Sequence, residues 1–108
     1  MIGGPENNVK FYQEKINELN LKNILLSGYK PHKDIAFYLS AADVLLGLWS
    51  SQVPTINYCS PLKIFEYMAS GKTIVAQDFP TIKEVLSHKE NAYLCNFNSY
   101  NDLKNKLI

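Results

Sequence analysis

The sequence has little of what several classes of protein require. No apolar run is long enough to span a bilayer, and the net charge of +1 comes without any run of basic residues. We therefore expect no transmembrane segment in the chain, and no dedicated nucleic-acid or membrane-surface binding, which needs a basic footprint. We also expect no signal peptide, because Met1 leads directly into Gly3 and Gly4.

Cysteine is scarce as well. The two cysteines, Cys59 and Cys95, lie far apart in sequence and match no metal-ligand spacing. We interpret them as reduced thiols of a cytoplasmic protein, with a disulfide between them as the alternative. Neither has a base or a second ligand nearby in sequence, so the sequence predicts no metal site and no cysteine chemistry.

The 108 residues are enough for one small domain, and 46% of them are hydrophobic, which permits a packed core. The chain opens unusually, because Ile2 followed by Gly3 and Gly4 is typical of the end of a strand and a glycine turn. A buried strand needs several residues. We therefore interpret residues 1–108 as one domain that is truncated at its N-terminal side.

Hydrophobic periodicity predicts helices that alternate with short apolar strands. The run at 44–49 is apolar at nearly every position, which is typical of a strand buried on both faces. Thr81 and Glu84 have the spacing of a capping box, and Ser99 with Asp102 forms a similar helix start. Five helices are predicted: 8–20, one after Pro31, 61–70 with Gly71 as its C-terminal glycine, 82–87 and one from Ser99. Five strands are predicted: one that ends at Ile2, and 24–27, 44–49, 73–77 and 92–97.

This alternation predicts an α/β fold, a Rossmann-like parallel sheet flanked by helices. Ligands of such sheets bind outside the carboxyl ends of the strands. The loops expected at that edge are 3–5, 28–31, 49–60, 77–80 and 96–98. The loop from Gly28 and the one that leads into Ser60 have the most specialised sequences.

The stretch SPLKIFEYMASGKTIVAQDFP, residues 60–80, carries the candidate site. Ser60 suits an N-cap and Pro61 the first helical position, which leaves the N–H groups of Leu62 and Lys63 free to hold an anion. Lys63 adds a positive charge at the same place. Glu66, one turn later, shares a helix face with Lys63 and is suited to accept hydrogen bonds from a ribose diol.

The alternative interpretation of the same pattern is an exposed ion pair between Lys63 and Glu66, worth a few tenths of a kcal/mol, about 0.3. Trp49, at the end of an apolar strand, is expected to pack in the core, with the wall of a sugar pocket as its alternative. The sequence pattern alone leaves both choices open.

The segment SPLKIFEYMASGKTIVAQDFPTIKEVL resembles the nucleotide-sugar-binding signature of family-4 (group 1) retaining glycosyltransferases with the GT-B fold. The upstream IGGPEN and NILLSGYKPHKDIAFYLSAADVLLGLW are similar to that family's glycine turn and to its base-binding loop with the elements that follow. The order and spacing of these pieces match too. The resemblance covers essentially the whole chain.

The resemblance implies a role for each part of the site. Glu66 is the second acid of an E-x7-E motif and holds the ribose hydroxyls, while the N–H groups of Leu62 and Lys63 face the diphosphate or the sugar. The base lies in the loop formed by Gly28, Tyr29, Lys30 and Pro31. The partner is a nucleotide diphosphate sugar, and the family requires neither a metal nor another cofactor.

The chain departs from the family at three places. Tyr58 stands where the first acid of E-x7-E is expected, which leaves recognition of the donor sugar open, and Ala92 replaces a common glycine. The family's Arg and Lys loop and its N-terminal acceptor-binding domain are absent from residues 1–108. No catalytic residue is therefore assigned, and we expect this chain alone to have no transferase activity.

Three functions are open at this stage. The first is the donor-binding half of a glycosyltransferase for surface polysaccharide or glycolipid, cytoplasmic or at the inner face of the membrane in its full-length form. The second is a non-catalytic α/β module, such as a receiver-like domain, which Gly3-Gly4 and Trp49 disfavour at positions where a receiver needs acids. The third is a degenerate domain that binds nucleotide without transferring a sugar.

Overall fold

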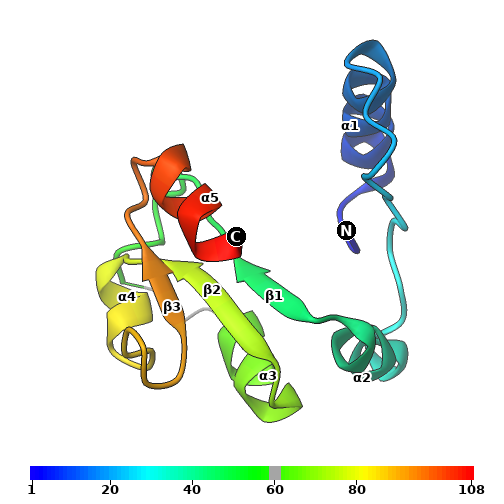
Figure 1. Cartoon of the computed structure of the whole chain (residues 1–108). Coiled ribbons are helices and arrows are strands. Elements are labelled where there is room, and N and C mark those ends of the chain that lie inside the picture. Colours follow the sequence, from blue (N-terminus) through cyan, green and yellow to red (C-terminus); the bar gives the residue numbers. More distant parts are fainter. Residues whose placement is uncertain (59–61) are drawn as a thin grey trace. The chain divides into compact units, whose positions relative to one another are not determined.

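The computed structural model of the protein describes residues 1–58 and 62–108, which form two compact units, Met1–Ala36 and Phe37–Ile108. The first unit contains α1 (Glu6–Glu18), and the boundary between the units falls within α2 (His32–Ala41) (Figure 1). Both helices are confirmed, each with bounds slightly different from those predicted.

The start of the first unit differs from the sequence prediction, because neither Ile2 nor the residues before Gly28 form an assigned strand. The amino group of Met1 donates to the Leu25 carbonyl at 2.6 Å, and the Ser27 N–H donates to the Met1 carbonyl at 2.9 Å. These two bonds follow the pattern of parallel strands. The Gly3 N–H then donates to Gly28 instead of Ser27, so the pairing slips by one residue and no regular ladder continues.

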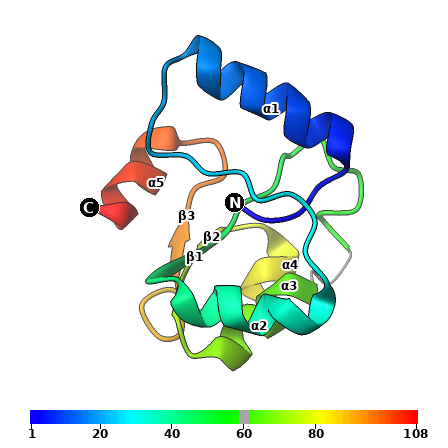
Figure 2. The ribbon, with the colours of Figure 1, turned by 90° about the vertical axis from the view of Figure 1, so that its right-hand side faces the viewer.

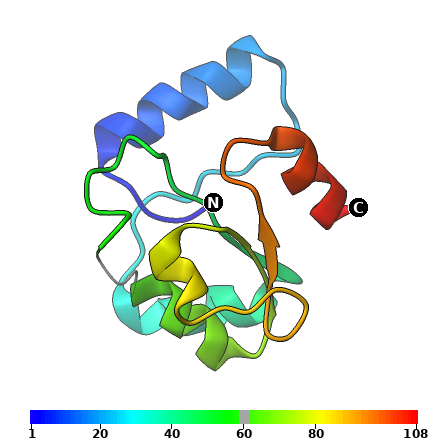
Figure 3. The same cartoon turned by 90° about the vertical axis from the view of Figure 1, so that its left-hand side faces the viewer.

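The second unit is built on a parallel sheet of three strands in the order β1 (Val44–Gly47), β2 (Thr73–Gln77), β3 (Tyr93–Cys95). The crossovers contain α3 (Leu62–Ser70) and α4 (Pro80–Lys83), and α5 (Tyr100–Leu107) follows the last strand. This alternation confirms the predicted α/β class. Figures 2 and 3 show α3 and α4 on one face of the sheet and α5 on the other.

Burial differs between the central strand and its neighbour. Ile74, Val75 and Ala76 of β2 are all buried, as the apolar run predicts for a strand covered on both faces. In β1, by contrast, Leu45 and Gly47 are buried while the alternate residues are exposed, so the prediction of two buried faces is wrong for this strand. The core cluster contains Ile56, Ile64, Ile74, Ala76, Phe79, Ile82, Leu86 and Ala92.

The helix ends confirm two sequence signals and contradict one. Ser99 caps α5 by accepting the Asp102 N–H, and Gly71 takes a left-handed conformation after α3, with φ of 68°. The capping box of Thr81 and Glu84 does not form: α4 begins at Pro80, and Glu84 is its C-cap. The Thr81 hydroxyl instead donates to the Ile56 carbonyl at 2.7 Å.

Candidate functional site

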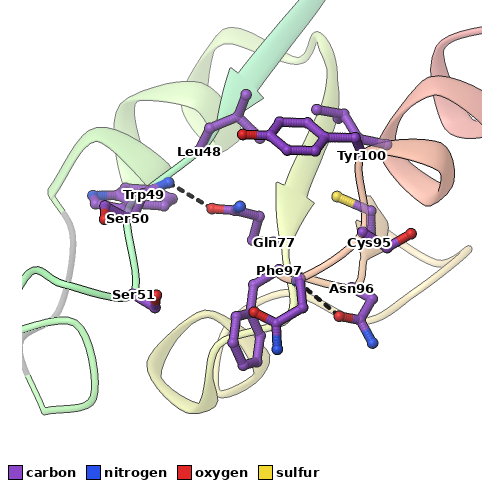
Figure 4. Close-up of a pocket in the computed structure, with 12 residues that line it drawn as sticks. Leu48, Trp49, Ser50, Ser51, Gln77, Cys95, Asn96, Phe97 and Tyr100 are labelled. Atoms are coloured by element: carbon purple, nitrogen blue, oxygen red, sulfur yellow. Dashed lines mark hydrogen bonds between the residues drawn. The ribbon is translucent and has the colours of Figure 1, made fainter.

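The candidate site lies at the carboxyl ends of the three strands, where a pocket of about 510 Å³ opens in the second unit (Figure 4). Ligands of parallel α/β sheets bind at this edge. The pocket is lined by Leu48, Trp49, Ser50, Ser51, Gln77, Cys95, Asn96, Phe97, Asn98, Ser99, Tyr100 and Leu103. These residues come from the segments that follow β1 and β3, from the last residues of β2 and β3, and from the start of α5.

Hydrogen bonds fix the polar rim of the pocket. The backbone N–H of Trp49 donates to Oε1 of Gln77 at 2.6 Å, which ties the end of β1 to the end of β2, and Figure 4 shows this bond. The Asn98 N–H donates to Oδ1 of Asn96 at 2.8 Å. The Asn96 N–H in turn donates to the carboxylate of Asp102 at 2.8 Å, which holds the pKa of that carboxyl below its usual value.

Lys63 connects α3 to this edge of the sheet. Its Nζ lies 5.0 Å from the centroid of the Trp49 ring, within the range of a cation–π contact. Ile64, the next residue, is fully buried, whereas Leu62 is 78% exposed. The first turn of α3 is thereby held beside Trp49 with its charged side chain on the surface.

Glu66 lies on the second turn of α3 and is half-buried. Its spacing from Lys63 places both side chains on one face of the helix. Next to it, the Tyr67 hydroxyl donates to the Leu46 carbonyl at 3.3 Å. Burial raises the pKa of the Tyr67 phenol, and the negative charge of Glu66 raises it further.

Close packing of α3 on β1 depends on one small residue. A Cβ at Gly47 would lie 3.0 Å from Cδ1 of Ile64, 3.1 Å from Cζ3 of Trp49 and 3.2 Å from Cβ of Ala76. Any side chain at this position would therefore crowd Ile64 of α3 and the Trp49 ring. This contact was not predictable from the sequence, because a glycine within an apolar strand has several explanations.

The predicted site residues fall into three groups. Leu62, Lys63 and Glu66 come together on α3, as predicted. Ser60 and Pro61, the predicted cap and first position, lie outside the described residues, as does Cys59. The four loop residues Gly28, Tyr29, Lys30 and Pro31 belong to the first unit, so their contact with the same ligand stays a prediction.

The loop at 28–31 begins with a glycine whose backbone conformation favours that residue type. Gly28 has a φ of 65°, a conformation that favours glycine, and its carbonyl accepts the Gly3 N–H at 2.7 Å. Tyr29 is 78% exposed. The sequence identified this loop by its glycine, and the structure shows why a glycine stands there.

Sequence analysis missed the residues that form most of the pocket. Gln77, Asn96 and Asn98 were recognised only as members of edge loops, and Tyr100 was not singled out. The available signal was position, since Gln77 ends β2 while Asn96 and Asn98 follow β3, at the edge where ligands bind. Trp49 packs against the hydrophobic core, as predicted, and also lines this pocket; that the pocket holds a sugar stays a prediction.

Among residues 1–58 and 62–108, no group of three or more His, Cys, Asp or Glu side chains is arranged to hold a metal ion. No helix in these segments is long and apolar enough to cross a membrane.

The chain is similar to known glycosyltransferases in sequence and in fold. The chain is 29% identical to an uncharacterized glycosyltransferase of Haemophilus influenzae, in an alignment that covers 92% of the chain and 29% of that protein. The structure matches HepE of Anabaena, solved in complex with UDP-glucose, with a TM-score of 0.77, 24% identity and coverage of 98% of the chain and 29% of HepE.

HepE in complex with UDP matches with a TM-score of 0.74, again at 24% identity, and the coverage is the same. The chain thus spans less than a third of the length of these relatives. The similarity confirms the predicted fold, part of a GT-B glycosyltransferase. All of residues 1–108 match the family described as glycosyl transferases group 1, and the chain belongs to that family.

Proposed function

We propose that the chain is the donor-binding half of a retaining glycosyltransferase. The complete protein would transfer a sugar from a nucleotide diphosphate sugar to an acceptor in surface polysaccharide or glycolipid synthesis. Family membership favours this function over a receiver-like module. HepE has been solved with UDP-glucose, which makes a UDP-sugar the first donor to test.

The contact between Lys63 and Trp49 carries the proposal. It holds the first turn of α3, where the Leu62 and Lys63 N–H groups have no helical partner, beside the pocket at the carboxyl edge of the sheet. The N–H groups of a first helical turn, the helix dipole and an ammonium group together favour a diphosphate. An exposed ion pair between Lys63 and Glu66 does not explain why Lys63 lies over an aromatic ring.

Each part of the donor has a proposed partner in the chain. The diphosphate lies against Leu62 and Lys63, Glu66 accepts the hydrogen bonds of the ribose diol, and the base is held by the loop at 28–31. Ser60 and Pro61 complete the start of the helix. No metal is assigned to this site, because Lys63 and the helix start supply the positive charge.

The contribution of these groups to transfer is electrostatic. As the bond between the anomeric carbon and the diphosphate oxygen breaks, negative charge grows on the departing diphosphate. Lys63 and the first-turn N–H groups are already aimed at this charge and need little reorganisation to stabilise it. The acceptor hydroxyl, which forms the new bond, is proposed to come from outside residues 1–108.

Thermal unfolding of the chain with UDP, GDP and ADP, each with and without a sugar, tests donor binding. Ligand stabilisation grows as RT ln(1 + [L]/Kd), so that a millimolar site raises the Tm at tens of millimolar ligand. We expect at least one nucleotide to raise the Tm. Glu66→Ala should abolish the shift, and Glu90→Ala, which removes an exposed carboxylate outside the site, should leave it unchanged.

Failure of every nucleotide to shift the Tm would contradict the donor site in this chain. Equal shifts in Tm for the wild type and Glu66→Ala would show that Glu66 is not part of the donor site. Sugar transfer by the complete protein, measured with a radiolabelled donor, separates an active enzyme from a domain that only binds nucleotide. In that assay Glu66→Ala should lower kcat/KM when Glu90→Ala does not.

A further inference from the structure

β3 lies at the outer border of the sheet, with β2 on one side only in the sheet that the structure describes (Figure 1). In a parallel pair, the backbone groups of successive residues point alternately toward the partner strand and away from it. Cys95 points toward β2, because its carbonyl accepts the Asp78 N–H at 3.0 Å. The backbone groups of its neighbours Leu94 and Asn96 therefore point outward, where an unpaired N–H would be open to another strand.

Two side chains accept hydrogen bonds from these outward donors. The Leu94 N–H donates to Nδ1 of His88 at 2.9 Å. The Asn96 N–H donates to Oδ2 of Asp102 at 2.8 Å. His88 belongs to the turn that precedes β3, and Asp102 belongs to α5, which follows it. The outer edge of β3 is thus closed by side chains from the segments before and after the strand.

The bond to Leu94 fixes the protonation state of the His88 imidazole. A backbone N–H can only donate, so Nδ1 must present its lone pair, and the ring is neutral with its proton on Nε2. A second proton would occupy Nδ1 and set two donors against each other. The turn itself is held independently, because the Lys89 N–H donates to the Ala92 carbonyl at 2.8 Å. Protonation would therefore break the bond to Leu94 without unfolding the turn.

The His88 ring is exposed, and charges of both signs surround it. The Asn96 N–H holds the pKa of the Asp102 carboxyl below its usual value, and the charges of Lys106 and His88 lower it further, so Asp102 lies within electrostatic reach of the ring. The Tyr93 ring meets His88 edge to face, with centroids 6.1 Å apart. The titratable groups on the elements beside the ring are Asp102 and Lys106 of α5, Tyr93 of β3, and Lys89 and Glu90 of its own turn. Two of these groups are cations and two are anions, so neither sign dominates.

From this arrangement we propose that His88 is a pH-sensitive latch on the outer edge of β3. Neutral His88 closes the edge by holding the Leu94 N–H, and protonated His88 releases it. Histidine side chains change charge between about pH 5 and pH 8, and the latch acts in that range. The second closure, between Asn96 and Asp102, persists there, because Asp102 keeps its charge to lower pH. Acid thus opens the middle of the edge and leaves closed the end of the strand that lines the pocket.

Nuclear magnetic resonance of the nitrogen-15-labelled chain tests the latch directly. At pH 8 the ring nitrogens of His88 should show a proton on Nε2 and none on Nδ1. As the pH falls to 5, the Leu94 amide resonance should shift with the same midpoint as the His88 ring. The protection of this amide from hydrogen exchange, corrected for the intrinsic rate, should fall about five-fold, the effect of one lost hydrogen bond. A proton on Nδ1 at pH 8, or a Leu94 amide that does not follow the ring, would overturn the proposal.

Two variants separate the hydrogen bond from the charge. His88→Asn places an amide oxygen where Nδ1 stands and cannot gain a proton, so the Leu94 amide should stay protected from pH 8 to pH 5. His88→Ala should show the lower protection at both pH values. His32→Asn is the matched control, because His32 is the other histidine of the sequence, and it should behave like the wild type. Full protection of Leu94 in His88→Ala would contradict the latch.

The Asn96 amide is the internal reference in the same spectra. Its protection should persist to pH 5, because its acceptor on Asp102 stays ionised. Loss of protection at Leu94 alone supports a latch at His88. Loss of protection at both amides with one midpoint would show that acid loosens the whole strand, and would overturn the proposal. No ligand is added in these measurements, so their outcome does not depend on the proposed donor site.

Discussion

The ammonium of Lys63 lies 5.0 Å from the centre of the Trp49 ring, which joins the first turn of α3 to the residue two positions beyond β1. The Trp49 backbone is in turn bonded to Gln77, at the end of β2. A single connected set of contacts therefore links the proposed diphosphate site to the pocket. A substitution in the diphosphate site should therefore affect the pocket, and a substitution in the pocket should affect the diphosphate site.

Replacing Lys63 tests the diphosphate site. Lys63→Met keeps most of the apolar stem but removes the charge, so UDP affinity should fall about ten-fold or more, the loss of one charge-assisted hydrogen bond. Calorimetric titration with UDP at low and high salt measures this. The wild type should lose affinity as salt rises, and the variant should lose much less.

Lys83→Met serves as the control, because Lys83 is an exposed lysine on α4. Its affinity for UDP should equal that of the wild type. If Lys63→Met and Lys83→Met bind UDP equally well, Lys63 does not contact the nucleotide.

Gly47→Ala should destabilise the second unit. The added Cβ would lie 3.0 Å from Ile64 and 3.1 Å from Trp49, so these neighbours must move, at a cost of about 1–3 kcal/mol. Urea unfolding gives this difference, and the emission of Trp49 in the folded state should change as well. Gly71→Ala is the comparison, because it meets no neighbour within 4 Å but has a φ of 68°.

The two glycine variants should therefore differ in kind. Gly71→Ala should cost about 1 kcal/mol through backbone strain and leave the Trp49 emission unchanged. An unchanged emission in Gly47→Ala would mean that the neighbouring side chains absorb the methyl group without moving α3.

The sequence predicted the elements whose pattern is local. The apolar run of β2, the alternation of helices and strands from α2 onward, the Ser99 cap and the glycine after α3 each depend on neighbouring residues, and all four were confirmed. The burial of β1 was not predictable from its own residues. An apolar run does not show which strand lies at the edge of a sheet, and β1 has β2 on one side only in the described sheet.

Contacts between distant residues explain the remaining misses. Thr81 has the spacing of a capping box, but its hydroxyl donates a hydrogen bond to the carbonyl of Ile56, 25 positions away. The site shows the same division: Lys63 and Glu66 were found because a helix places them one turn apart. Gln77 and Asn96 became site residues only when the sheet brought the ends of β2 and β3 together.

The hydroxyl of Thr81 should be needed to hold the loop that precedes α3. It is buried and donates to Ile56 at 2.7 Å, so Thr81→Val leaves a buried carbonyl without its partner, at a cost of about 1–3 kcal/mol. Thr81→Ser keeps the donor and should recover most of the stability. Urea unfolding of both variants checks the prediction, and equal losses would assign the effect to packing instead of the hydrogen bond.

The stability of the second unit should fall as the solution becomes alkaline. Burial raises the pKa of the Cys95 thiol and of the Tyr67 phenol, so the folded protein keeps protons that the unfolded chain releases. The free energy of unfolding is therefore unaffected below the ordinary thiol pKa of about 8.5 and decreases as the pH rises from there toward the raised value. The phenol adds the same effect at higher pH.

Cys95→Ala isolates the part of this effect that comes from the thiol. The variant should be less stable at neutral pH, because it removes a buried group, but its free energy of unfolding should decline less between pH 8 and pH 10. Urea unfolding at a series of pH values measures both slopes. If the wild-type and Cys95→Ala curves run parallel through this interval, the thiol titrates alike in the folded and unfolded chains, and burial does not hold its proton.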